Sequence, residues 1–485
     1  MSLQFHNQLT KAVDTFSPLK DGHVSLYTCG PTVYNYPHIG NWSGYIYWDI
    51  LVRVLQANNL TVTRVMNITD VGHLVSDEDD GEDKLEKSAR REGKTAWELA
   101  EFYTTDFLEG MDALNLVPPT HIAKATDYID EQLALVQTLK ENGYTYQISD
   151  GIYFNTAKFP QYGDFAHLDL AAQKAGARVA LNPEKHNPSD FALWKFTPEG
   201  EHRDMEWTTP ADLTDNGTER SGFPGWHLEC SAMAMNILGE TLDIHTGGID
   251  HIPVHHTNEI AQSEAATGQQ FSRLWLHNNH LKVNGTKISK SLDNGFTLKD
   301  LSDKGFSPLD FRMFVLQSSY HNEGNFTFEN LTAAQQRLSH WRTVAALRHQ
   351  THDTIQNDDE KSTDDQSVSL YAASQALLEA LSDDLDTPEG FVIIDDAFSR
   401  LERVPVKAIH QHAFVSFLAT IDELLGLQLL QTTPDIDDDE KRLILERERA
   451  REDQNWKLAD KLRVQLEKSG VTVRDTANGP IWEYS

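Results

Sequence analysis

Residues 24–30, Val-Ser-Leu-Tyr-Thr-Cys-Gly, predict a buried strand that ends at Gly30. From Trp42 to Asn58 apolar residues recur every three or four positions, which is the spacing of a helix, and Leu60 to Ile68 returns as a β-branched strand. Strand, helix and strand in this order predict a βαβ unit. Sheets built from such units bind ligands at the carboxyl ends of their strands, where polar residues stand here. We therefore expect an α/β fold with a Rossmann-type parallel sheet.

The start of the predicted helix carries the residues His38-Ile39-Gly40-Asn41. Free N–H groups and the positive end of the helix dipole attract phosphate at such a start. Gly40 would let a nucleotide lie close to the backbone, and His38 and Asn41 could donate hydrogen bonds to charge developing on a phosphate. A turn capped by Asn41 is the commoner meaning of these four residues, so by themselves they leave both interpretations open.

A second informative stretch is residues 243–262, Asp-Ile-His-Thr-Gly-Gly-Ile-Asp-His-Ile-Pro-Val-His-His-Thr-Asn-Glu-Ile-Ala-Gln. Its proline suits the first turn of a helix, so His255 and Glu259, four residues apart, should share one helical face. With Cys29 and Cys230, the only cysteines of the chain, they would fill four positions around zinc. The alternatives are an exposed His–Glu pair, and cysteines that are buried small hydrophobes or a disulfide. A disulfide is disfavoured, because bridge-stapled secreted chains carry more cysteines at short spacings.

Two further stretches carry candidate binding residues. Residues 225–233, Gly-Trp-His-Leu-Glu-Cys-Ser-Ala-Met, follow a turn marked by Gly and Pro and predict a helix with Trp226 and His227 at its mouth, although Trp226 could equally belong to the core. The stretch Lys-Ile-Ser-Lys-Ser-Leu-Asp-Asn, which begins at Lys287, follows a Val-Asn-Gly turn. Lys287 and Lys290 make it a cationic loop suited to a polyphosphate, whereas lysine and serine in alternation are also usual in plain surface loops.

The composition indicates a large protein of the cytoplasm. A chain of 485 residues should hold about two to four domains. It has no apolar stretch long enough to span a bilayer, and its start is too polar for a signal peptide, so we expect a cytoplasmic location and no membrane contact. The formal charge of −32 argues against a general nucleic-acid coat, because phosphate contacts need Lys and Arg, but it permits a local basic surface.

The pattern of the chain changes along its length. Helical spacing from about Leu85 to Leu114 and from Asp127 to Asn142 precedes a region, 150–210, rich in short strands, Gly and Pro. We expect an insertion between the two halves of the sheet there, and we assign no chemistry to it.

Helical spacing returns from Leu331 to Leu424, with a last helix stopped by Gly426, and predicts a helical bundle. A polar stretch from about His349 to Gln366 interrupts it as a loop or linker, and a second acidic linker spans Thr432 to Glu440. Residues 441–468 carry nine Lys or Arg against six Asp or Glu, which predicts a mixed helix. Such a helix is usually a solvated face, but it is also the best candidate in this chain for an RNA contact.

Taken together, these stretches resemble bacterial cysteinyl-tRNA synthetases, which are class I enzymes, over nearly the whole chain. The motifs that carry the resemblance are Thr28 to Tyr34, His38 to Asn41 for the HIGH-type signature, Asn67 to Asp70, Gly225 to Met233, His255 to Gln262, Lys287 to Ser291 for the KMSKS signature, Asp383 to Pro388 and Asp475 to Trp482. The resemblance implies a catalytic domain over 1–320 with an insertion at about 115–215, a tRNA-binding bundle over 321–430 and an anticodon-end domain over 431–485.

The resemblance also implies an activity, ATP-dependent ligation of L-cysteine to tRNA(Cys) through a cysteinyl-adenylate, by a monomer. One Zn²⁺ per chain would be held by Cys29, Cys230, His255 and Glu259, and Mg²⁺ would accompany ATP. The residues implied in catalysis and ATP binding are His38, Gly40, Asn41, Lys287 and Lys290, and those implied at the amino acid are Thr69, Trp226 and His227. Zinc would select cysteine over serine by binding the thiolate.

Three rivals remain at this stage: a cysteine ligase with a small amino-sugar acceptor, a zinc-dependent hydrolase, and a non-catalytic zinc or RNA-binding module. The sequence also departs from the family pattern at a few positions. Ile288 replaces the usual Met, Asp293 stands where Gly is typical, Trp42-Ser43-Gly44 replaces a segment with an Arg and a Thr, and Thr257 replaces an acidic residue.

Overall fold

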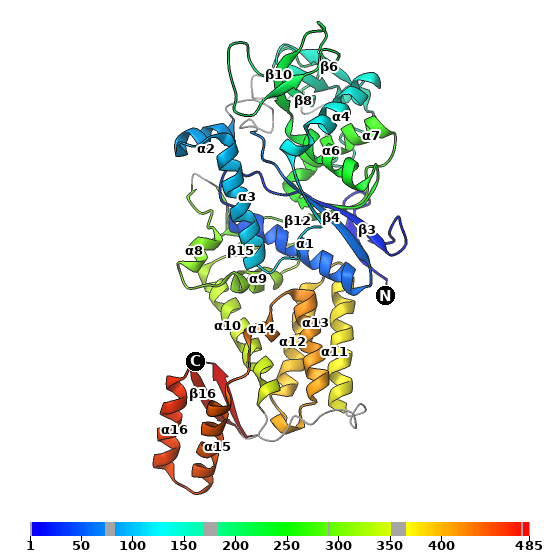
Figure 1. Ribbon diagram of the computed structural model, residues 1–485. Coiled ribbons are helices and arrows are strands. Elements are labelled where there is room, and N and C mark those ends of the chain that lie inside the picture. The colour runs from blue at the N-terminus through cyan, green and yellow to red at the C-terminus, as the bar shows by residue number, and fades with distance from the viewer. Residues whose placement is uncertain are drawn as a thin grey trace.

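The computed structural model describes residues 2–72, 83–168, 182–289, 292–350, 365–476 and 479–484. These residues form an elongated molecule, with the sheets and their helices at one end, a helical bundle below them and a small C-terminal domain at the other end (Figure 1). A hairpin of β1 (Gln4–Asn7) and β2 (Ala12–Thr15) stands at the start of the described chain.

The central sheet has five parallel strands in the order β12-β11-β3-β4-β5. Its strands are β3 (His23–Thr28), β4 (Thr61–Ile68), β5 (His121–Lys124), β11 (Leu242–Gly248) and β12 (Ser272–Asn278). Helix α1 (Ile39–Ala57) connects β3 to β4, which confirms the predicted βαβ unit and the α/β fold class. The helix begins earlier than the apolar spacing indicates, because His38 caps its first turn.

The helical run predicted from Leu85 to Leu114 is two helices, α2 (Lys84–Glu92) and α3 (Ala96–Ala113). The break follows from Gly93, which ends α2 with a φ of 68°, and from Thr95, which starts α3 with a reciprocal capping box. Apolar spacing alone did not register this break, because a glycine is tolerated inside a helix.

A second, antiparallel sheet lies between β5 and β11 in the sequence, with the order β6-β7-β8-β10-β9. Its elements and the helices packed on it are α4 (Ile129–Glu141), β6 (Thr145–Ile148), β7 (Gly151–Phe154), β8 (Phe191–Phe196), β9 (Trp207–Thr209), β10 (Arg220–Pro224), α6 (Trp226–Leu238) and α7 (Thr257–Thr267). Leu228 and Ala232 of α6 pack against this sheet, whereas Cys230 and Met233 pack against the parallel sheet. Helix α6 is therefore held between the two sheets.

Beyond β12 the chain forms a small sheet of β13 (Leu281–Val283), β14 (Thr286–Lys287) and β15 (Gly324–Phe326), with α8 (Leu298–Ser302) and α9 (Pro308–Leu316) between the last two. The predicted Val-Asn-Gly turn joins β13 to β14. Asn284 and Gly285 have φ values of 49° and 73°, as a tight hairpin turn requires.

The predicted bundle is formed by α10 (Phe328–Ala346), α11 (Asp365–Ser382), α12 (Thr387–Leu401) and α13 (Gln411–Leu425), followed by the short α14 (Leu429–Thr432). The interrupting stretch predicted from His349 to Gln366 lies mostly outside the described residues. Trp341 is fully buried and packs its ring 5.0 Å from that of Phe391 and 5.7 Å from that of Phe398. The core of the bundle is continuous with the core around α1.

A buried charge cluster fastens the bundle to α1. Asp49, in the middle of α1, is fully buried and accepts hydrogen bonds from Arg312 and, at 2.7 Å, from Nε of Arg53. Arg312 also donates to the carbonyl of Leu425 at the end of α13 (2.6 Å), and Arg53 donates to that of Asn115 (2.6 Å). Because an unpaired buried charge is costly, this arrangement fixes the end of α13 against α1.

The predicted stop at Gly426 is confirmed, since this residue caps α13 with a φ of 62°. An added Cβ would lie 2.6 Å from Nη2 of Arg312. We expect Gly426→Ala to destabilise the bundle by roughly 2–3 kcal/mol, from the left-handed backbone and from displacement of that guanidinium. Thermal unfolding followed by tryptophan fluorescence would measure it. Gly470→Ala is the matched control, because Gly470 has a φ of 85° but no atom within 4 Å of an added Cβ; equal midpoints for the two variants would contradict the role of Arg312.

The C-terminal domain packs α15 (Asp438–Glu452) and α16 (Trp456–Lys468) on a hairpin of β16 (Val471–Thr476) and β17 (Gly479–Tyr484). The predicted single mixed helix is thus two helices, and the predicted acidic linker ends at Asp437, which caps α15 together with Glu440. In the described part of the chain, helices are too short or too polar to cross a membrane.

Candidate functional site

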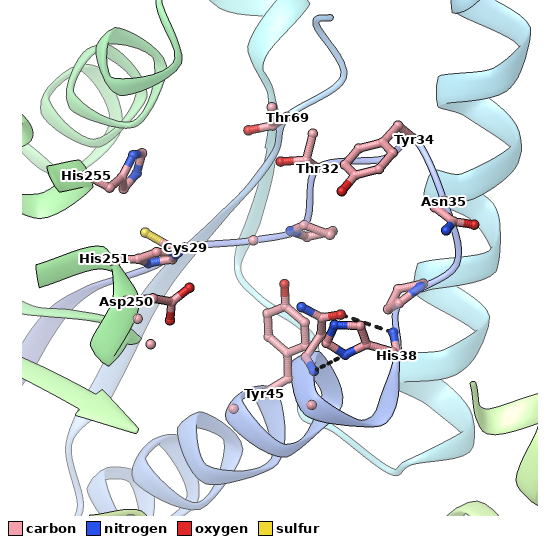
Figure 2. Close-up of a pocket in the computed structure, with 18 of the residues that line it drawn as sticks. Cys29, Thr32, Tyr34, Asn35, His38, Tyr45, Thr69, Asp250, His251 and His255 are labelled. Atoms are coloured by element: carbon pink, nitrogen blue, oxygen red, sulfur yellow. Dashed lines mark hydrogen bonds between the residues drawn. The ribbon is translucent and has the colours of Figure 1, made fainter. Parts of the chain in front are cut away.

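A cavity of about 760 Å³ opens at the carboxyl ends of β3, β4 and β11. Figure 2 shows the two sides of this cavity, with His38 at the start of α1 on one side and Cys29, His251 and His255 on the other. Parallel strands point their carboxyl ends to one edge of a sheet, so residues that follow different strands meet there.

All four predicted metal ligands converge at one side of this cavity. Cys29 follows β3, and Cys230 lies in α6, between the two sheets. His255 lies in a π-helical turn, Ile252–His256, and Glu259 in the first turn of α7. One donor atom from each residue lies within 4.8 Å of the others. Both cysteines of the chain are described and both are free thiols, which rules out the disulfide alternative in this structure.

The local structure explains how the two helical ligands meet. A π turn is rare and is often found at functional sites. Thr257, at the position where the family usually has an acidic residue, closes this turn with a hydrogen bond from its hydroxyl to the carbonyl of Ile252 (2.7 Å). Nε2 of His255 then lies 2.8 Å from Oε1 of Glu259.

The donor atoms fit a metal ion. Nδ1 of His255 is hydrogen bonded to Nδ1 of His227 (3.0 Å), so Nε2 is the nitrogen turned toward the other ligands. Oε2 of Glu259 is held by His245 (2.9 Å), whereas its Oε1 is fully buried and faces Nε2 of His255 (2.8 Å). A buried oxygen with free lone pairs beside two sulfurs and an imidazole nitrogen is the donor set that zinc accepts. The hydrogen bonds from His227 to His255 and from His245 to Glu259 are of the kind that orients metal ligands from outside the coordination sphere.

The protonation of these groups is strongly perturbed. Burial and the adjacent Cys230 raise the pKa of the Cys29 thiol, while a hydrogen bond from Cys29, acting against burial, lowers the pKa of Cys230 to about 7. Against burial, the charge of Glu259 raises the pKa of His255 to about 10, and His245 and His255 hold the pKa of Glu259 well below its usual range. The Glu259 carboxylate and the more acidic of the two thiols are thus near the forms that bind metal, whereas His255 would release a proton on binding.

A second set of donors, Cys29, His245, His256 and Glu259, also converges within 4.8 Å. We favour the first set, because Cys230 and His255 line the cavity and His245 and His256 do not. His256 is instead hydrogen bonded to His277 (2.7 Å) and lies 3.3 Å from the sulfur of Cys29, as an outer contact would.

The residues expected at the amino acid lie beside this cluster. Thr69, Trp226 and His227 all line the cavity. The Trp226 ring lies 4.5 Å from that of His255, so Trp226 forms a wall of the cavity rather than part of the core. The Thr69 hydroxyl donates to the buried carboxylate of Glu229 (3.0 Å), and this bond fixes its orientation.

His38 and Asn41 cap each other at the opposite side of the cavity. The backbone N–H of Asn41 donates to Nδ1 of His38 (3.2 Å), and the side-chain oxygen of Asn41 accepts from the N–H of His38 (3.1 Å). Because Nδ1 is an acceptor, the neutral ring carries its proton on Nε2. Burial lowers the pKa of His38 and favours this neutral form. His38 therefore presents an N–H donor, and the expected capping role and the expected binding role are compatible.

The cationic loop lies against this helix start. An added Cβ on Gly40 would lie 2.9 Å from Cδ1 of Ile288, so glycine is required for the close approach. Lys287 and Ser289 line the cavity, and the N–H of Ser289 donates to Asn294 (2.9 Å). Asp293 has a φ of 48°, which explains why glycine is typical there. Lys290 and Ser291 lie outside the described residues.

The segment Trp42-Ser43-Gly44, which departs from the family pattern, has a packing role. The Trp42 ring stacks on that of Phe107 in α3 (5.1 Å, 10°), and an added Cβ on Gly44 would lie 2.9 Å from the side chain of Asn278. These contacts hold α1 against α3 and β12.

Lys195 was not predicted as a site residue, because it lies in the region to which no chemistry was assigned. Lys195 comes from β8, lines the cavity and pairs with Asp150 (2.6 Å) and the hydroxyl of Tyr153 (3.0 Å). Its signal in the sequence is a lysine within the apolar run Phe-Ala-Leu-Trp-Lys-Phe, residues 191–196. His245, which lies behind the ligands, was also not singled out, although the density of histidine in the quoted stretch was visible.

Comparisons with known proteins show the family to which this chain belongs. Residues 15–336 match the family described as tRNA synthetases class I (C) catalytic domain, and residues 433–482 match the cysteinyl-tRNA ligase anticodon binding domain. The chain is 39% identical to a cysteine–tRNA ligase of Treponema denticola, with 100% of both chains covered. It is 40% identical to cysteine–tRNA ligase 1 of Burkholderia lata, with 99% of this chain and 96% of the relative covered.

Among solved structures, the fold is similar to methionyl-tRNA synthetase of Mycobacterium tuberculosis in complex with methionyl-adenylate. The TM-score is 0.58 at 15% identity, with 85% of this chain and 91% of that chain covered, and this likeness bears on the fold alone. The family matches and the full-length relatives show more than the fold: this chain belongs to the class I cysteine–tRNA ligase family.

Proposed function

We propose that this protein joins L-cysteine to tRNA(Cys) through a cysteinyl-adenylate, and that it selects cysteine by its sulfur. The observation that carries the proposal is that Cys29, Cys230 and His255, with the buried Glu259 behind them, converge on the cavity that His38 and Lys287 also line. A site for a soft metal and a site for phosphate thus share one space, which is what activation of a thiol amino acid needs.

Selection of cysteine is the harder task, because packing alone discriminates poorly between cysteine and serine. A zinc ion on the four ligands would lower the pKa of the substrate thiol and bind the soft thiolate, which a serine hydroxyl does not match. Trp226 and His227 would enclose the amino acid, and Thr69, oriented by Glu229, would offer a polar contact. No separate proofreading site is needed if selection occurs at binding.

In the first step the cysteine carboxylate attacks the α-phosphate of ATP, and pyrophosphate leaves. His38 would donate its Nε2–H, and Asn41 its side-chain amide, to phosphate oxygens at the start of α1. Lys287, with Lys290 beyond the described residues, would neutralise the leaving pyrophosphate, together with Mg²⁺ brought by ATP. Their contribution is positioning and charge stabilisation.

In the second step a hydroxyl of the terminal ribose of tRNA attacks the carbonyl carbon of the adenylate, and AMP leaves as the ester forms. We propose the division of labour given by the sequence: catalysis by residues 1–320, with the insertion at about 115–215, tRNA binding by the bundle over 321–430, and the anticodon end bound by 431–485. Trp456, at the start of α16, is 57% exposed, and the Arg451 guanidinium lies 5.8 Å from its ring. An exposed ring beside a guanidinium suits an unpaired base.

The test is ATP–pyrophosphate exchange with cysteine and serine side by side, on protein assayed for zinc, followed by charging of a tRNA(Cys) transcript. We expect one zinc per chain, exchange that depends on cysteine, and cysteine attached to the transcript. Exchange without charging, combined with transfer to a glucosaminyl-inositol acceptor, would favour the amino-sugar ligase. That alternative is disfavoured, because residues 433–482 match an anticodon-binding family. Hydrolytic turnover without ATP would favour the hydrolase.

A further inference from the structure

The rim of the catalytic cavity carries a cluster of aromatic and cationic side chains that the proposed mechanism does not use. We call Tyr36, Arg91, Lys94 and Phe102 the rim patch. Tyr36 and Arg91 line the cavity, and Lys94 and Phe102 extend the patch outward over the junction of α2 and α3. Tyr36 and Phe102 are 44% and 43% exposed, respectively, so both rings are open to solvent.

The two exposed rings are held in place from below. Tyr103, which is buried, lies edge-on to both, with ring centroids 5.0 Å from Tyr36 and 5.1 Å from Phe102. The rings of Tyr36 and Phe102 are 6.1 Å apart in a T-shaped arrangement. The hydroxyl of Tyr103 donates to Glu92 (3.0 Å), which secures it in turn. The rings are therefore preorganised surfaces rather than loose side chains.

The Lys and Arg of this corner all lie in α2 and the turn after it, whereas α3 carries only acidic charge. Residues 84–94 contain five Lys or Arg and two Glu, a net charge of +3, in a chain of net charge −32. The carboxylates nearby are already engaged. Glu92 accepts from the Tyr103 hydroxyl and pairs with both cations of the patch, Lys94 at 3.3 Å and Arg91 at 3.5 Å, so a phosphate would have to displace it. Glu98 caps the start of α3, and Glu101 pairs with Lys124 (2.7 Å). The ammonium of Lys94 lies 4.3 Å from the centroid of the Phe102 ring, so cation and ring form one surface.

Exposed rings beside cations are the recognition chemistry of single-stranded nucleic acid, in which bases stack on the rings and phosphates lie on the cations. In a double helix the bases are stacked on each other and are not available to a protein ring. Free pyrophosphate has no base that could stack on Tyr36 or Phe102. The 3′ end of the acceptor strand of tRNA is single-stranded and has to enter the cavity to reach an adenylate, and two residues of the rim patch line that cavity. Figure 1 shows α2 and α3 projecting from the same side of the molecule as α15 and α16, so one elongated RNA would run along that side.

We propose that the rim patch binds the single-stranded 3′ end of tRNA, with one base stacked on Phe102 and Tyr36 and a phosphate at Arg91 and Lys94. The proposal rests on the proposed function. It adds a site outside the ATP and cysteine pockets, and it predicts that the patch acts in transfer to tRNA and not in cysteine activation.

The test compares Phe102→Ala with the wild type, both full-length and loaded with zinc. We expect the KM for tRNA to rise about tenfold, since one stacked base is lost, while cysteine-dependent pyrophosphate exchange is unchanged. Phe102→Tyr should restore the KM. Leu108→Ala is the matched control, because Leu108 is 39% exposed on the same helix but makes no part of the patch. Lys94→Ala should lower the slope of log affinity against log salt by about 0.7, the value for one single-strand phosphate.

A truncated tRNA that lacks its single-stranded 3′ nucleotides decides where the patch acts. We expect wild type and Phe102→Ala to bind this RNA equally. A tenfold loss that persists with the truncated RNA, or an equal loss in Leu108→Ala, would overturn the proposal, as would a normal KM in Phe102→Ala. The proposed function fails separately, if the wild type itself attaches no cysteine to tRNA.

Discussion

Cys230→Ser is expected to lose its zinc and, with it, activation of cysteine. The substitution replaces a soft sulfur whose pKa is lowered to about 7 by a hydroxyl that stays protonated, so one of four donors no longer binds the ion. A substrate that lacks the one group a site is built to bind is rejected by about 10⁴-fold. Without the ion the thiol of cysteine has no partner, so we expect a fall of this size in cysteine-dependent pyrophosphate exchange. Cys29→Ser should also lose zinc and cysteine activation, because the sulfur of Cys29 lies in the same cluster of donor atoms.

The measurement has two parts, metal content per chain and exchange with cysteine and with serine. Metal content reports on the site without reference to activity. Met233→Leu, at a buried position on the same helix, is the control, because the substitution conserves volume and Met233 is not one of the four proposed ligands. Stoichiometric zinc together with normal exchange in Cys230→Ser would remove this residue from the metal site. Retained zinc with lost exchange would point instead to the second donor set, through His245 and His256.

His38→Asn is expected to lower the rate of adenylate formation by about 10²–10³-fold, the cost of removing one donor aimed at a transition state. Asparagine is itself a strong N-cap, so it can replace the capping contact to Asn41 but not the Nε2–H of the imidazole. Thermal stability should therefore be close to that of the wild type. His38→Ala should lose the same activity and, in addition, about 1 kcal/mol of stability from the missing cap.

Single-turnover formation of cysteinyl-adenylate separates this step from product release. Asn58, at the other end of the same helix, offers a control, since Asn58→Ala alters a helix end far from the cavity. A normal adenylate rate in His38→Asn would mean that the imidazole acts only as a cap, and the phosphate would then have to be held by the backbone of α1 and by the cationic loop.

Local sequence patterns gave the elements of this fold with their approximate ends. The βαβ unit, the bundle helices and the stop at Gly426 follow from interactions between residues close in sequence, such as apolar spacing and a glycine that tolerates a left-handed backbone. Where apolar spacing was compatible with either one helix or two, capping contacts between residues close in sequence determined the break. The helix predicted to run through Gly93 is broken, because Thr95 and Glu98 cap a new one just beyond it.

The site residues divide in a similar way. The chemical types of the four ligands, the helix start at His38 and the lysine loop were all visible in the sequence. Lys195 was not, because it reaches the cavity only through the pairing of β8 with β7 and β10, strands of the second sheet. The rim patch was also missed, since Tyr36 and Phe102 come from different segments and meet only when α3 packs beside the loop before α1.

By itself, the sequence determined which side chains are available and the local structure that carries each of them, because backbone conformation depends mainly on near neighbours. Only the tertiary structure decided that the thiols of Cys29 and Cys230 meet the imidazole of His255 in one cavity. That meeting depends on the pairing of β3 with β11 and on the packing of α6 between two sheets. Contacts of this kind are set by how distant surfaces fit together, which no local spacing encodes.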